Sequence, residues 1–391
     1  MTIVMAKAYN IFNRIVSAYI SNGTYRRSGE AENGNRKPED RIAGICTPEC
    51  LKCPLLNKAE QRMNIYDVAQ EAGVSIATVS RVVNGKSVVS SKTREKVEAV
   101  LKRHNYTPSE IARGLVLNSI RTVGIMAVDI RDVYYANVAH TVEQELSKLG
   151  YTVILCNTGE DAKEKIRYMN ILMKKKVDGI ILVGSVFKDA SLEGAIAGIA
   201  GKVPIVMING FVDSPNVYSV ICDDCSGVFQ AVEYLIAQGR KKLVYLQDTN
   251  TFSARAKVEG FRKAMKSNKL EVNGNNLFRV RKGLEGGYEG MEMIAGKGIS
   301  FDAALCGDDL TAIGSIRYLK DRGIPVPGEV AVIGYNNSIL AACCEPVLTS
   351  VDSRMFEMGR IAIEIFSKVM DGEHAEQKTY LQPGLCKGKS G

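Results

Sequence analysis

Beginning at Arg121, short apolar runs alternate with longer stretches in which apolar residues recur every three or four positions. The apolar runs predict strands at Thr122–Val128, Thr152–Cys156, Gly179–Val183, Ile205–Asn209, Ser219–Ile221, Lys242–Gln247, Ala303–Cys306 and Val330–Gly334. The amphipathic stretches predict helices at Tyr135–Leu149, Ala162–Lys175, Gly227–Gln238, Ala254–Ser267, Tyr288–Ala295 and Leu310–Asp321. Near-continuous apolar strands that alternate with helices are typical of a parallel sheet covered on both faces. The units are too many for one small sheet, which favours two consecutive doubly wound α/β subdomains with a ligand cleft at the carboxyl ends of their strands.

The region between residues 63 and 104 has a different pattern, with short helical repeats on either side of Gly73. Ser75 is a good N-cap for the second helix, and a third helix is predicted at Ser91–His104. The apolar positions of the three helices predict a shared core made of Ile65, Val68, Ala69, Ala72, Val79, Val82, Val83, Val97, Val100 and Leu101. A short helix, a glycine turn and a second helix with a small, polar and basic outer face predict an all-α helix-turn-helix that binds DNA.

The segment Tyr106–Leu117 predicts a short helix between these two regions. Thr107 is suited to the N-cap, Pro108 to the first helical position, and Glu110 completes a capping box. A helix of about two turns is marginal in water without a partner, and Gly114 lowers its stability further. We therefore expect a hinge helix that folds when it docks.

Composition and charge separate a basic N-terminal third from a neutral body. The 391 residues are 46% hydrophobic and 24% charged, which fits two or three domains with large cores. No apolar run approaches the roughly 18 residues of a membrane span, so no membrane association is expected. Residues 1–62 contain ten Lys or Arg against six Asp or Glu, residues 63–120 eight against five, and residues 121–391 33 against 32. This asymmetry indicates that the N-terminal part meets an anionic polymer.

Cysteine usage, the N-terminal sequence and the lack of catalytic motifs argue against a secreted protein and against an enzyme. Ten cysteines without disulfide-like spacing are typical of the reducing cytoplasm. Lys7 and Arg14 interrupt the N-terminal apolar stretch, which predicts no secretory signal. No catalytic triad, phosphate loop or metal-ligand cluster occurs at useful spacing in the body, so neither enzyme activity nor a cofactor is expected. The CxxC pair Cys222 and Cys225 is expected to end a strand and begin a helix rather than to serve redox chemistry.

Residues 1–62 form an extension unlike the rest of the chain. The polar, Gly- and Asn-rich stretch of residues 21–40 predicts disorder or a linker. Cys46, Cys50 and Cys53 have the spacing with which radical enzymes hold a four-iron cluster, but no barrel follows and no fourth ligand lies nearby. Two alternatives stay open for residues 1–62. They form a metal-binding segment, or they come from an over-long reading frame whose true start is near Met63.

Three runs in combination are similar to the lac repressor/galactose repressor family of bacterial transcription regulators, in particular its catabolite-control branch. They are YDVAQEAGVSIATVSRVVN (residues 66–84), SSKTREKVEAVLKRHNYTPSEIARGL (90–115) and TVGIM (122–126). The resemblance extends from Met63 to the C-terminus. It implies contacts to phosphates or groove edges by Tyr66, Ser75, Thr78, Ser80, Asn84, Ser90, Thr93 and Tyr106. It implies base contacts in the major groove by Ile76, Ala77 and Arg81, and minor-groove contacts by Ser109, Ala112 and Leu115, of which Leu115 would be the wedge between base pairs.

For the body, the resemblance implies a periplasmic-binding-protein-like fold whose chain passes three times between the subdomains. We expect these crossings near Asn209–Val212, Ile333–Tyr335 and Thr349–Asp352. One subdomain would then hold residues 121–210 and 336–352, and the other residues 211–335 and 353–391. The resemblance implies effector contacts in the cleft by Tyr134, Tyr135, Asp309 and Lys257, the last at a position where the family usually carries arginine. Arg255 is the candidate to supply the guanidinium that Lys257 lacks.

The sequence thus predicts an extension (1–62), a helix-turn-helix headpiece (63–107), a hinge helix and linker (108–120) and an effector-binding and dimerisation body (121–391). We expect a cytoplasmic homodimer that represses transcription from a pseudo-palindromic double-stranded DNA operator. A small-molecule effector in the cleft, a sugar or a related carbohydrate, would control it allosterically. The alternatives are a solute-binding receptor without DNA function and a regulator controlled by a phosphoprotein corepressor.

Overall fold

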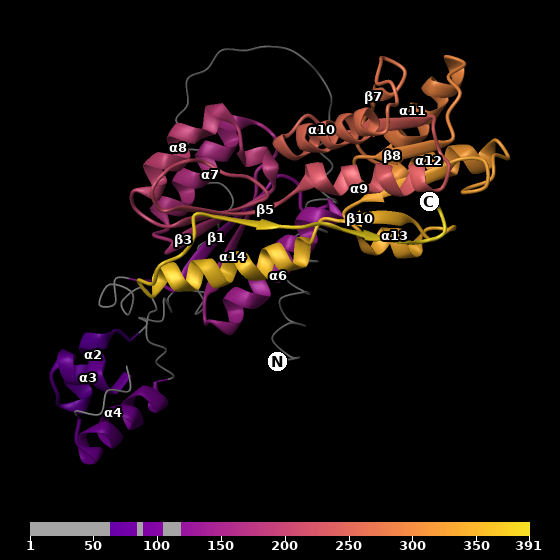
Figure 1. Ribbon diagram of the computed structural model, residues 1–391. Coiled ribbons are helices and arrows are strands. Elements are labelled where there is room, and N and C mark those ends of the chain that lie inside the picture. Colours follow the sequence, from indigo (N-terminus) through magenta and orange to yellow (C-terminus); the bar gives the residue numbers. More distant parts are fainter. Residues whose placement is uncertain (1–62, 84–88, 105–118) are drawn as a thin grey trace, which may run out of the picture. The chain divides into compact units, whose positions relative to one another are not determined.

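The computed structural model describes residues 63–83, 89–104 and 119–391, and the chain divides into two compact units, Met1–Thr107 and Pro108–Gly391 (Figure 1). The division falls at the predicted end of the headpiece. The extension and the hinge segment, with Cys46, Cys50 and Cys53, lie outside the described residues. We describe the two units one after the other.

The headpiece contains three helices around one small core, as predicted. They are α2 (Ile65–Ala72), α3 (Ile76–Val83) and α4 (Ser91–Arg103). Val68, Val79 and Val97, one from each helix, are fully buried against one another. Gly73 ends α2 with φ of +64°, a left-handed conformation that glycine adopts without steric cost. Some predicted core positions, such as Val83, lie half-buried at the edge of the core instead.

Side-chain caps fix where each of these helices begins. Asn64 forms a reciprocal capping box with Asp67 at the start of α2. At the start of α3, the Thr78 amide donates to Ser75 Oγ at 3.2 Å. At the start of α4, the Thr93 amide donates to Ser90 Oγ at 3.4 Å. The serine N-cap that the sequence predicted for the second helix is therefore confirmed.

The body contains two six-stranded sheets, which define a first and a second subdomain. The first sheet has the order β11-β5-β4-β3-β1-β2, with β1 (Thr122–Ala127), β2 (Thr152–Asn157), β3 (Gly179–Val183), β4 (Ile205–Ile208), β5 (Val217–Cys222) and β11 (Lys378–Leu381). The second has the order β12-β10-β9-β8-β6-β7, with β6 (Leu243–Gln247), β7 (Leu277–Arg279), β8 (Ala303–Cys306), β9 (Ala331–Tyr335), β10 (Thr349–Asp352) and β12 (Gly384–Cys386). All neighbouring pairs are parallel except β10 and β12, which are antiparallel. The eight predicted strands are present, and β7, β10, β11 and β12 are additional.

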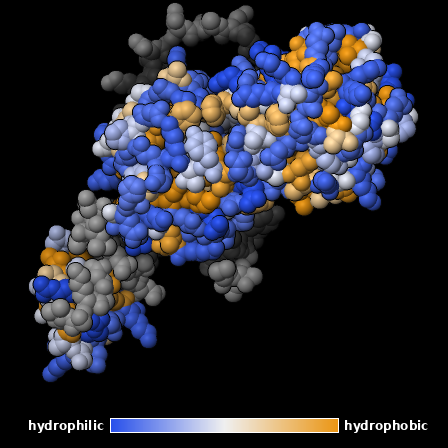
Figure 2. All heavy atoms as spheres, in the orientation of Figure 1, coloured by the Kyte–Doolittle hydropathy of each residue, from blue (hydrophilic) through white to orange (hydrophobic). Residues whose placement is uncertain are grey.

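Helices cover both faces of each sheet, as near-continuously apolar strands require. The first sheet is covered by α6 (Val133–Lys148) and α14 (Met355–Met370) on one face and by α7 (Ala162–Lys174) and α8 (Ala190–Ala200) on the other. The second is covered by α9 (Asp224–Ala237) and α10 (Phe252–Ser267) on one face and by α11 (Leu284–Gly296), α12 (Asp309–Asp321) and the short α13 (Ile339–Cys343) on the other. On the face of the body in Figure 2, hydrophobic residues form small patches among hydrophilic ones.

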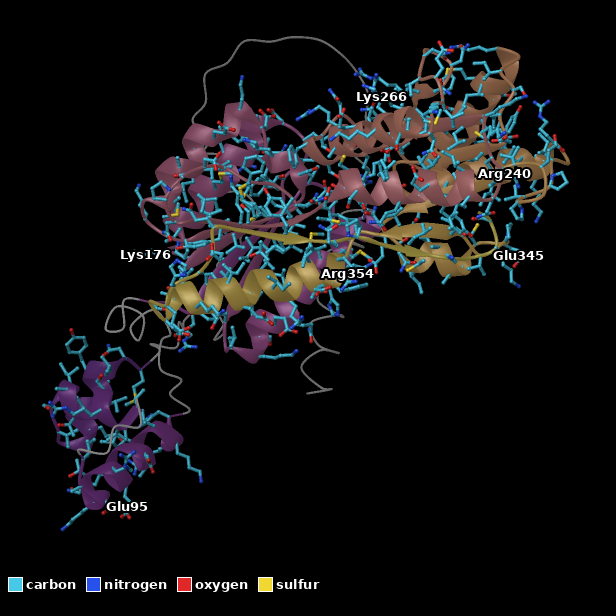
Figure 3. The ribbon with its side chains drawn as sticks, viewed as in Figure 1. Glu95, Lys176, Arg240, Lys266, Glu345 and Arg354 are labelled. Carbon is cyan, nitrogen blue, oxygen red and sulfur yellow. The ribbon has the colours of Figure 1, made fainter. Side chains whose placement is uncertain are left out.

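The chain crosses between the subdomains at 222–224, 352–355 and 381–384, which corrects two of the three predicted positions. The first predicted crossing, Asn209–Val212, is wrong because the chain returns to the same sheet as β5. The second, Ile333–Tyr335, lies inside β9. The third, Thr349–Asp352, is β10 and directly precedes the observed crossing, which Arg354 marks in Figure 3.

The subdomain boundaries change accordingly. Residues 336–352 belong to the second subdomain and residues 353–381 to the first, the reverse of the prediction, and 211–222 also belong to the first. The physical reason is that α14 packs its apolar face on α6 and the first sheet, while β11 adds a parallel edge strand beside β5. The CxxC pair lies at the first crossing, where Cys222 ends β5 and Cys225 lies in the first turn of α9, as predicted. Both thiols are free.

Candidate functional site

The exposed face of α3 carries the side chains that the sequence assigned to base contacts. Ile76, Ala77 and Arg81 are exposed, while Val79 and Val82 on the opposite face are buried. Ile76 is 41% exposed, and Tyr66 of α2 is 67% exposed, although both side chains are largely apolar. Apolar and basic side chains that a small core leaves exposed on its second helix are what a helix-turn-helix presents to the major groove.

The polar candidates in the headpiece have structural roles as well. Ser75 and Ser90 cap α3 and α4, and their hydroxyls lie 2.9 Å from the hydroxyls of Thr78 and Thr93. These side chains are thus held at the amino ends of two helices, where the helix dipoles favour an anion such as a phosphate. Ser80 is half-buried on α3. Asn84, Tyr106, Ser109, Ala112 and Leu115 lie outside the described residues.

A cavity of about 840 Å³ in the body is lined by residues of both subdomains. Its walls are the segments that follow β1, β2, β3 and β4 in the first sheet and β6, β7, β8 and β9 in the second. All of these strands present their carboxyl ends to it, where ligands bind in open α/β sheets. Such a volume accommodates a small-molecule ligand. The predicted inter-subdomain cleft is therefore present.

Four of the five predicted effector residues line this cavity: Tyr134, Tyr135, Arg255 and Lys257. The two tyrosine rings meet edge to face, with centroids 5.5 Å apart. The hydroxyl of Tyr134 is buried without a hydrogen-bond partner among the described residues, and burial raises its pKa well above the ordinary value. Burial likewise raises the pKa of Tyr135 to about 12. Both phenols therefore stay neutral at any physiological pH.

Lys257 lies at the floor of the cavity, 8% exposed. Its Nζ donates to the Gly307 carbonyl at 2.8 Å and lies 3.6 Å from the centroid of the Tyr335 ring. The Tyr335 hydroxyl in turn donates to Asp224 at 2.6 Å, and the Asn209 amide donates to the same carboxylate at 3.3 Å. Because Asn209 directly follows β4 and Asp224 lies at the first crossing, where α9 begins, this buried network joins the cavity floor to the hinge between the subdomains.

Asp309 does not line the cavity, which corrects the prediction for this residue. It is 1% exposed, and its carboxylate accepts from the amide and hydroxyl of Ser338 at 2.7 and 2.8 Å and from the Ser350 hydroxyl at 2.5 Å. Burial raises the pKa of Asp309, and the bonds from the two serines oppose that rise. Its role is to tie α12 to the segments around β9 and β10.

The neighbouring Asp308 is the acidic residue that faces the cavity. It is the N-cap of α12, and its Oδ1 accepts from the Thr311 amide at 3.0 Å. Burial, together with the charge of Asp248, raises the pKa of Asp308 to about 6. Of the two adjacent acidic residues at the start of α12, only the N-cap Asp308 lines the cavity, whereas Asp309, the first helical residue, is buried.

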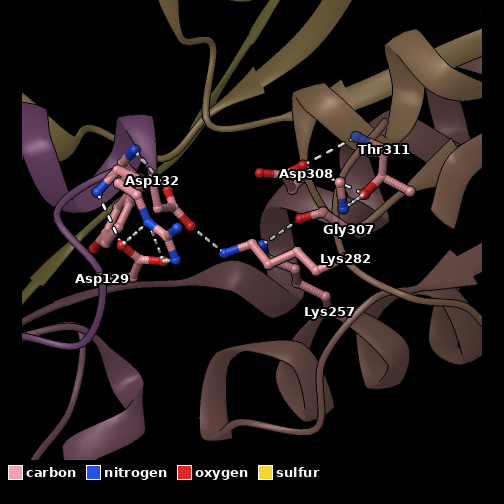
Figure 4. Close-up of polar contacts among 10 residues, drawn as sticks. Asp129, Asp132, Lys257, Lys282, Gly307, Asp308 and Thr311 are labelled. Carbon is pink, nitrogen blue, oxygen red and sulfur yellow. Dashed lines mark hydrogen bonds and ion pairs between the residues drawn. The ribbon is translucent and has the colours of Figure 1, made fainter. Parts of the chain in front are cut away.

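The cavity wall is polar and nearly balanced in charge. Its ionisable side chains are Asp129, Asp132, Glu160, Asp189, Asp248 and Asp308, and Lys165, Lys188, Arg255, Lys257 and Lys282. Figure 4 shows Lys282 in an ion pair with Asp132 and Lys257 bound to Gly307. Sequence reasoning missed Lys165, which is buried with its Nζ 3.3 Å from the Val186 carbonyl and whose pKa burial lowers. Such a wall suits a polar ligand with several hydroxyl groups.

Within the described residues, no group of three or more His, Cys, Asp or Glu side chains is arranged to hold a metal ion. In the same part of the chain, no helix is long and apolar enough to span a membrane.

Comparison with known families assigns both parts of the chain. Residues 64–109 match the model described as bacterial regulatory proteins, lacI family. Residues 232–390 match the model described as periplasmic binding protein-like domain. A helix-turn-helix joined to such a body defines a DNA-binding transcription regulator and not an enzyme.

Individual relatives are similar in sequence to this chain over nearly their whole lengths. An HTH-type transcriptional regulator of Lachnoclostridium phytofermentans is 40% identical over 330 residues, which cover 84% of this chain and 99% of that protein. Catabolite control protein A of Priestia megaterium is 31% identical over 82% of this chain and 96% of its own. The lac repressor dimer bound to operator and an anti-inducer is 25% identical, with a TM-score of 0.77 over 84% of this chain and 99% of that chain. The protein belongs to the lacI family of bacterial regulatory proteins.

Proposed function

We propose that this chain is a repressor that binds a pseudo-palindromic operator as a homodimer, and that a sugar or sugar-related effector in the cavity controls its affinity for DNA. The observation that carries the DNA part is the exposed face of α3, with Ile76, Ala77 and Arg81 on one side of a buried three-helix core. The dimer rests on likeness, since the related lac repressor was solved as a dimer on its operator. Binding to chromosomal DNA would place the protein in the cytoplasm.

On the operator, Arg81 is proposed to read a guanine, because a guanidinium can donate two hydrogen bonds to its major-groove edge. Tyr66, Ser75, Thr78, Ser80, Asn84, Ser90, Thr93 and Tyr106 are proposed to contact phosphates or groove edges. Ser109, Ala112 and Leu115 of the hinge segment are proposed to enter the minor groove, and Leu115 to open the central base step.

The effector part rests on the cavity between the two subdomains. Its wall offers aromatic faces from Tyr134 and Tyr135 and hydrogen-bonding groups from Arg255, Lys257 and Asp308. Aromatic faces and carboxylates that accept from hydroxyls are the groups that sugars require. A related regulator, 27% identical with a TM-score of 0.63, was solved in complex with cellobiose. A ligand that contacts both subdomains would change the angle between them and so the affinity for DNA.

The DNA part is tested by affinity of the full chain, at one salt concentration, for a pseudo-palindrome with a central CG step and for a scrambled duplex. We expect a preference of about a thousandfold or more. Arg81→Ala should cost about 1–3 kcal/mol on the specific probe only, because it removes a base contact. Weak, equal and steeply salt-dependent binding to both probes would mean that the operator is a different one or that the headpiece no longer reads sequence.

The effector part is tested by thermal unfolding with neutral mono- and disaccharides, starting with cellobiose. A ligand at about 100 times its Kd stabilises the folded chain by about 2.7 kcal/mol. We expect such stabilisation with at least one sugar, and its loss in Tyr135→Ala. If no sugar stabilises the chain, a phosphoprotein corepressor becomes the favoured control, since catabolite control protein A is a relative.

A further inference from the structure

An ion pair connects the two subdomains across the cavity. Asp132 is the N-cap of α6 in the first subdomain, and Lys282 precedes α11 in the second (Figure 4). One carboxylate oxygen of Asp132 accepts from the Tyr134 amide at 2.9 Å and thus serves the cap. The other accepts from Lys282 Nζ. The helix cap therefore fixes the carboxylate in place, and the lysine reaches it from the opposite wall.

An aromatic contact bridges the subdomains at a second point. Phe211, between β4 and β5, meets Phe252, the first residue of α10, edge to face with ring centroids 5.5 Å apart. In the first sheet, β3 lies between β1 and β4. The Asp132 and Phe211 contacts therefore flank the segment that follows β3, whose Gly184, Ser185 and Val186 line the cavity. The two subdomains therefore contact each other on both sides of this segment.

Lys282 has an alternative partner on its own subdomain. Although burial opposes its charge, the carboxylates of Asp132 and Asp308 together raise the pKa of Lys282 above the ordinary value. Its ammonium also lies 5.7 Å from the centroid of the Tyr135 ring. If the subdomains separate, the lysine loses Asp132 but keeps Asp308, which moves with it. Separation therefore leaves Lys282 near one of the two carboxylates that raise its pKa.

We propose that the Asp132–Lys282 pair is a clasp that favours the closed arrangement of the two subdomains, so that an effector enters or leaves the cavity when this pair separates. The inference concerns regulation of the site and rests on the proposed function only in taking the cavity as the effector site. The side chains of Lys282 and Asp132 are 42% and 15% exposed, so solvent screens the pair partly. Pairs of this exposure shift an equilibrium by up to about fivefold.

The test measures the distance between the subdomains in the ligand-free full chain. Spin labels on keto-bearing non-natural residues would replace Lys163 of α7 and Lys266 of α10, which are exposed and belong to different subdomains. Figure 3 labels Lys266. Lys282→Met removes the charge and keeps the length of the side chain. Asp132→Asn removes the charge and keeps a good N-cap. We expect each variant, and the double variant to the same extent, to increase the population of longer distances by two- to fivefold.

Arg281→Met is the matched control, because Arg281 pairs with Glu289 within the second subdomain and its loss should leave the distances unchanged. A rise in salt from about 0.05 to 0.5 M should lengthen the wild-type distances but not those of Lys282→Met. The salt dependence of the wild-type distances tests the clasp even if a variant does not fold. If the distances between the labels change neither with salt nor with substitution of Asp132 or Lys282, the proposed clasp is wrong. Specific DNA affinity, measured separately, tests the proposed function, so the two can fail independently.

Discussion

The hydroxyl of Tyr335 offers the sharpest test of the contacts beneath the cavity. It donates to Asp224 at 2.6 Å, and Asp224, which is 2% exposed, has one further side-chain donor among the described residues, the Asn209 amide at 3.3 Å. Tyr335→Phe removes one oxygen and leaves the ring that Lys257 contacts in place. The substitution thus isolates one hydrogen bond of a buried network that joins both subdomains.

The expected loss follows from burial and charge. A hydrogen bond to a charged group contributes about 1.5–3 kcal/mol, and Asp224 is only 2% exposed, so bulk solvent does not replace the lost donor. In domains of 150–250 residues, a loss of about 1 kcal/mol lowers Tm by about 2–4 °C. Because the body, residues 121–391, is larger than that range, we take the lower conversion and expect Tyr335→Phe to lower its Tm by about 3–6 °C.

Differential scanning calorimetry of the full chain measures this change in the transition of the body. Tyr380→Phe is the matched control, because Tyr380 is 60% exposed on the edge strand β11 and its hydroxyl faces water. The control should melt with the wild type. If Tyr335→Phe also melts within about 1 °C of the wild type, Asp224 does not depend on this bond and the reasoning is refuted.

Three further predictions concern the cavity, the headpiece and the hinge. The pKa of Asp308 is raised to about 6, so the folded chain binds a proton at this carboxyl more tightly than the unfolded chain does. The stability that follows from this proton is fully present below about pH 4 and is lost as the pH rises through about 6. Asp308→Asn keeps the helix cap and should raise Tm at pH 7 and flatten its dependence between pH 4 and 7; identical pH profiles in both proteins would contradict this. Gly73→Ala should destabilise the headpiece by about 1–2 kcal/mol, since φ is +64°, whereas Gly73→Asn should cost less; the circular dichroism melting curve distinguishes them, and equal curves would exclude backbone strain as the cause. Leu115→Ala should weaken binding to the specific operator and leave the scrambled duplex unaffected in a binding titration, because a wedge contributes only to a bent complex; unchanged specific affinity would argue against minor-groove insertion.

Local patterns predicted the headpiece well because its determinants are close in sequence. Gly73 and Ser75 fix the turn and the start of α3 within three positions, and helical spacing separates Val79 and Val82 from Arg81. The apolar runs of the body were equally clear, and all eight predicted strands are present.

The parts that escaped prediction depend on contacts between distant residues. The strands β10, β11 and β12 are short, and the sheet that each joins depends on its pairing with β9, β5 and β10, which no local pattern records. Lys282 stands in a loop without periodicity, and its partner Asp132 is 150 positions away. Asp308 and Asp309 are adjacent acidic residues whose roles diverge only because one is a cap and the other the first residue of the helix.

The last strand of each sheet has a consequence for the order in which the protein becomes stable. The first sheet ends with β11 and the second with β12, both between residues 378 and 386, while most of their partner strands precede residue 353. Until these residues are synthesised, β5 and β10 each expose an unpaired edge that can join another chain. Ser390, fully buried between Val332 and Thr349, extends this dependence further. Chains released from ribosomes that stall before residue 378 would thus have two unpaired strand edges and would be prone to aggregate. The cell would have to degrade such fragments in order to produce this regulator.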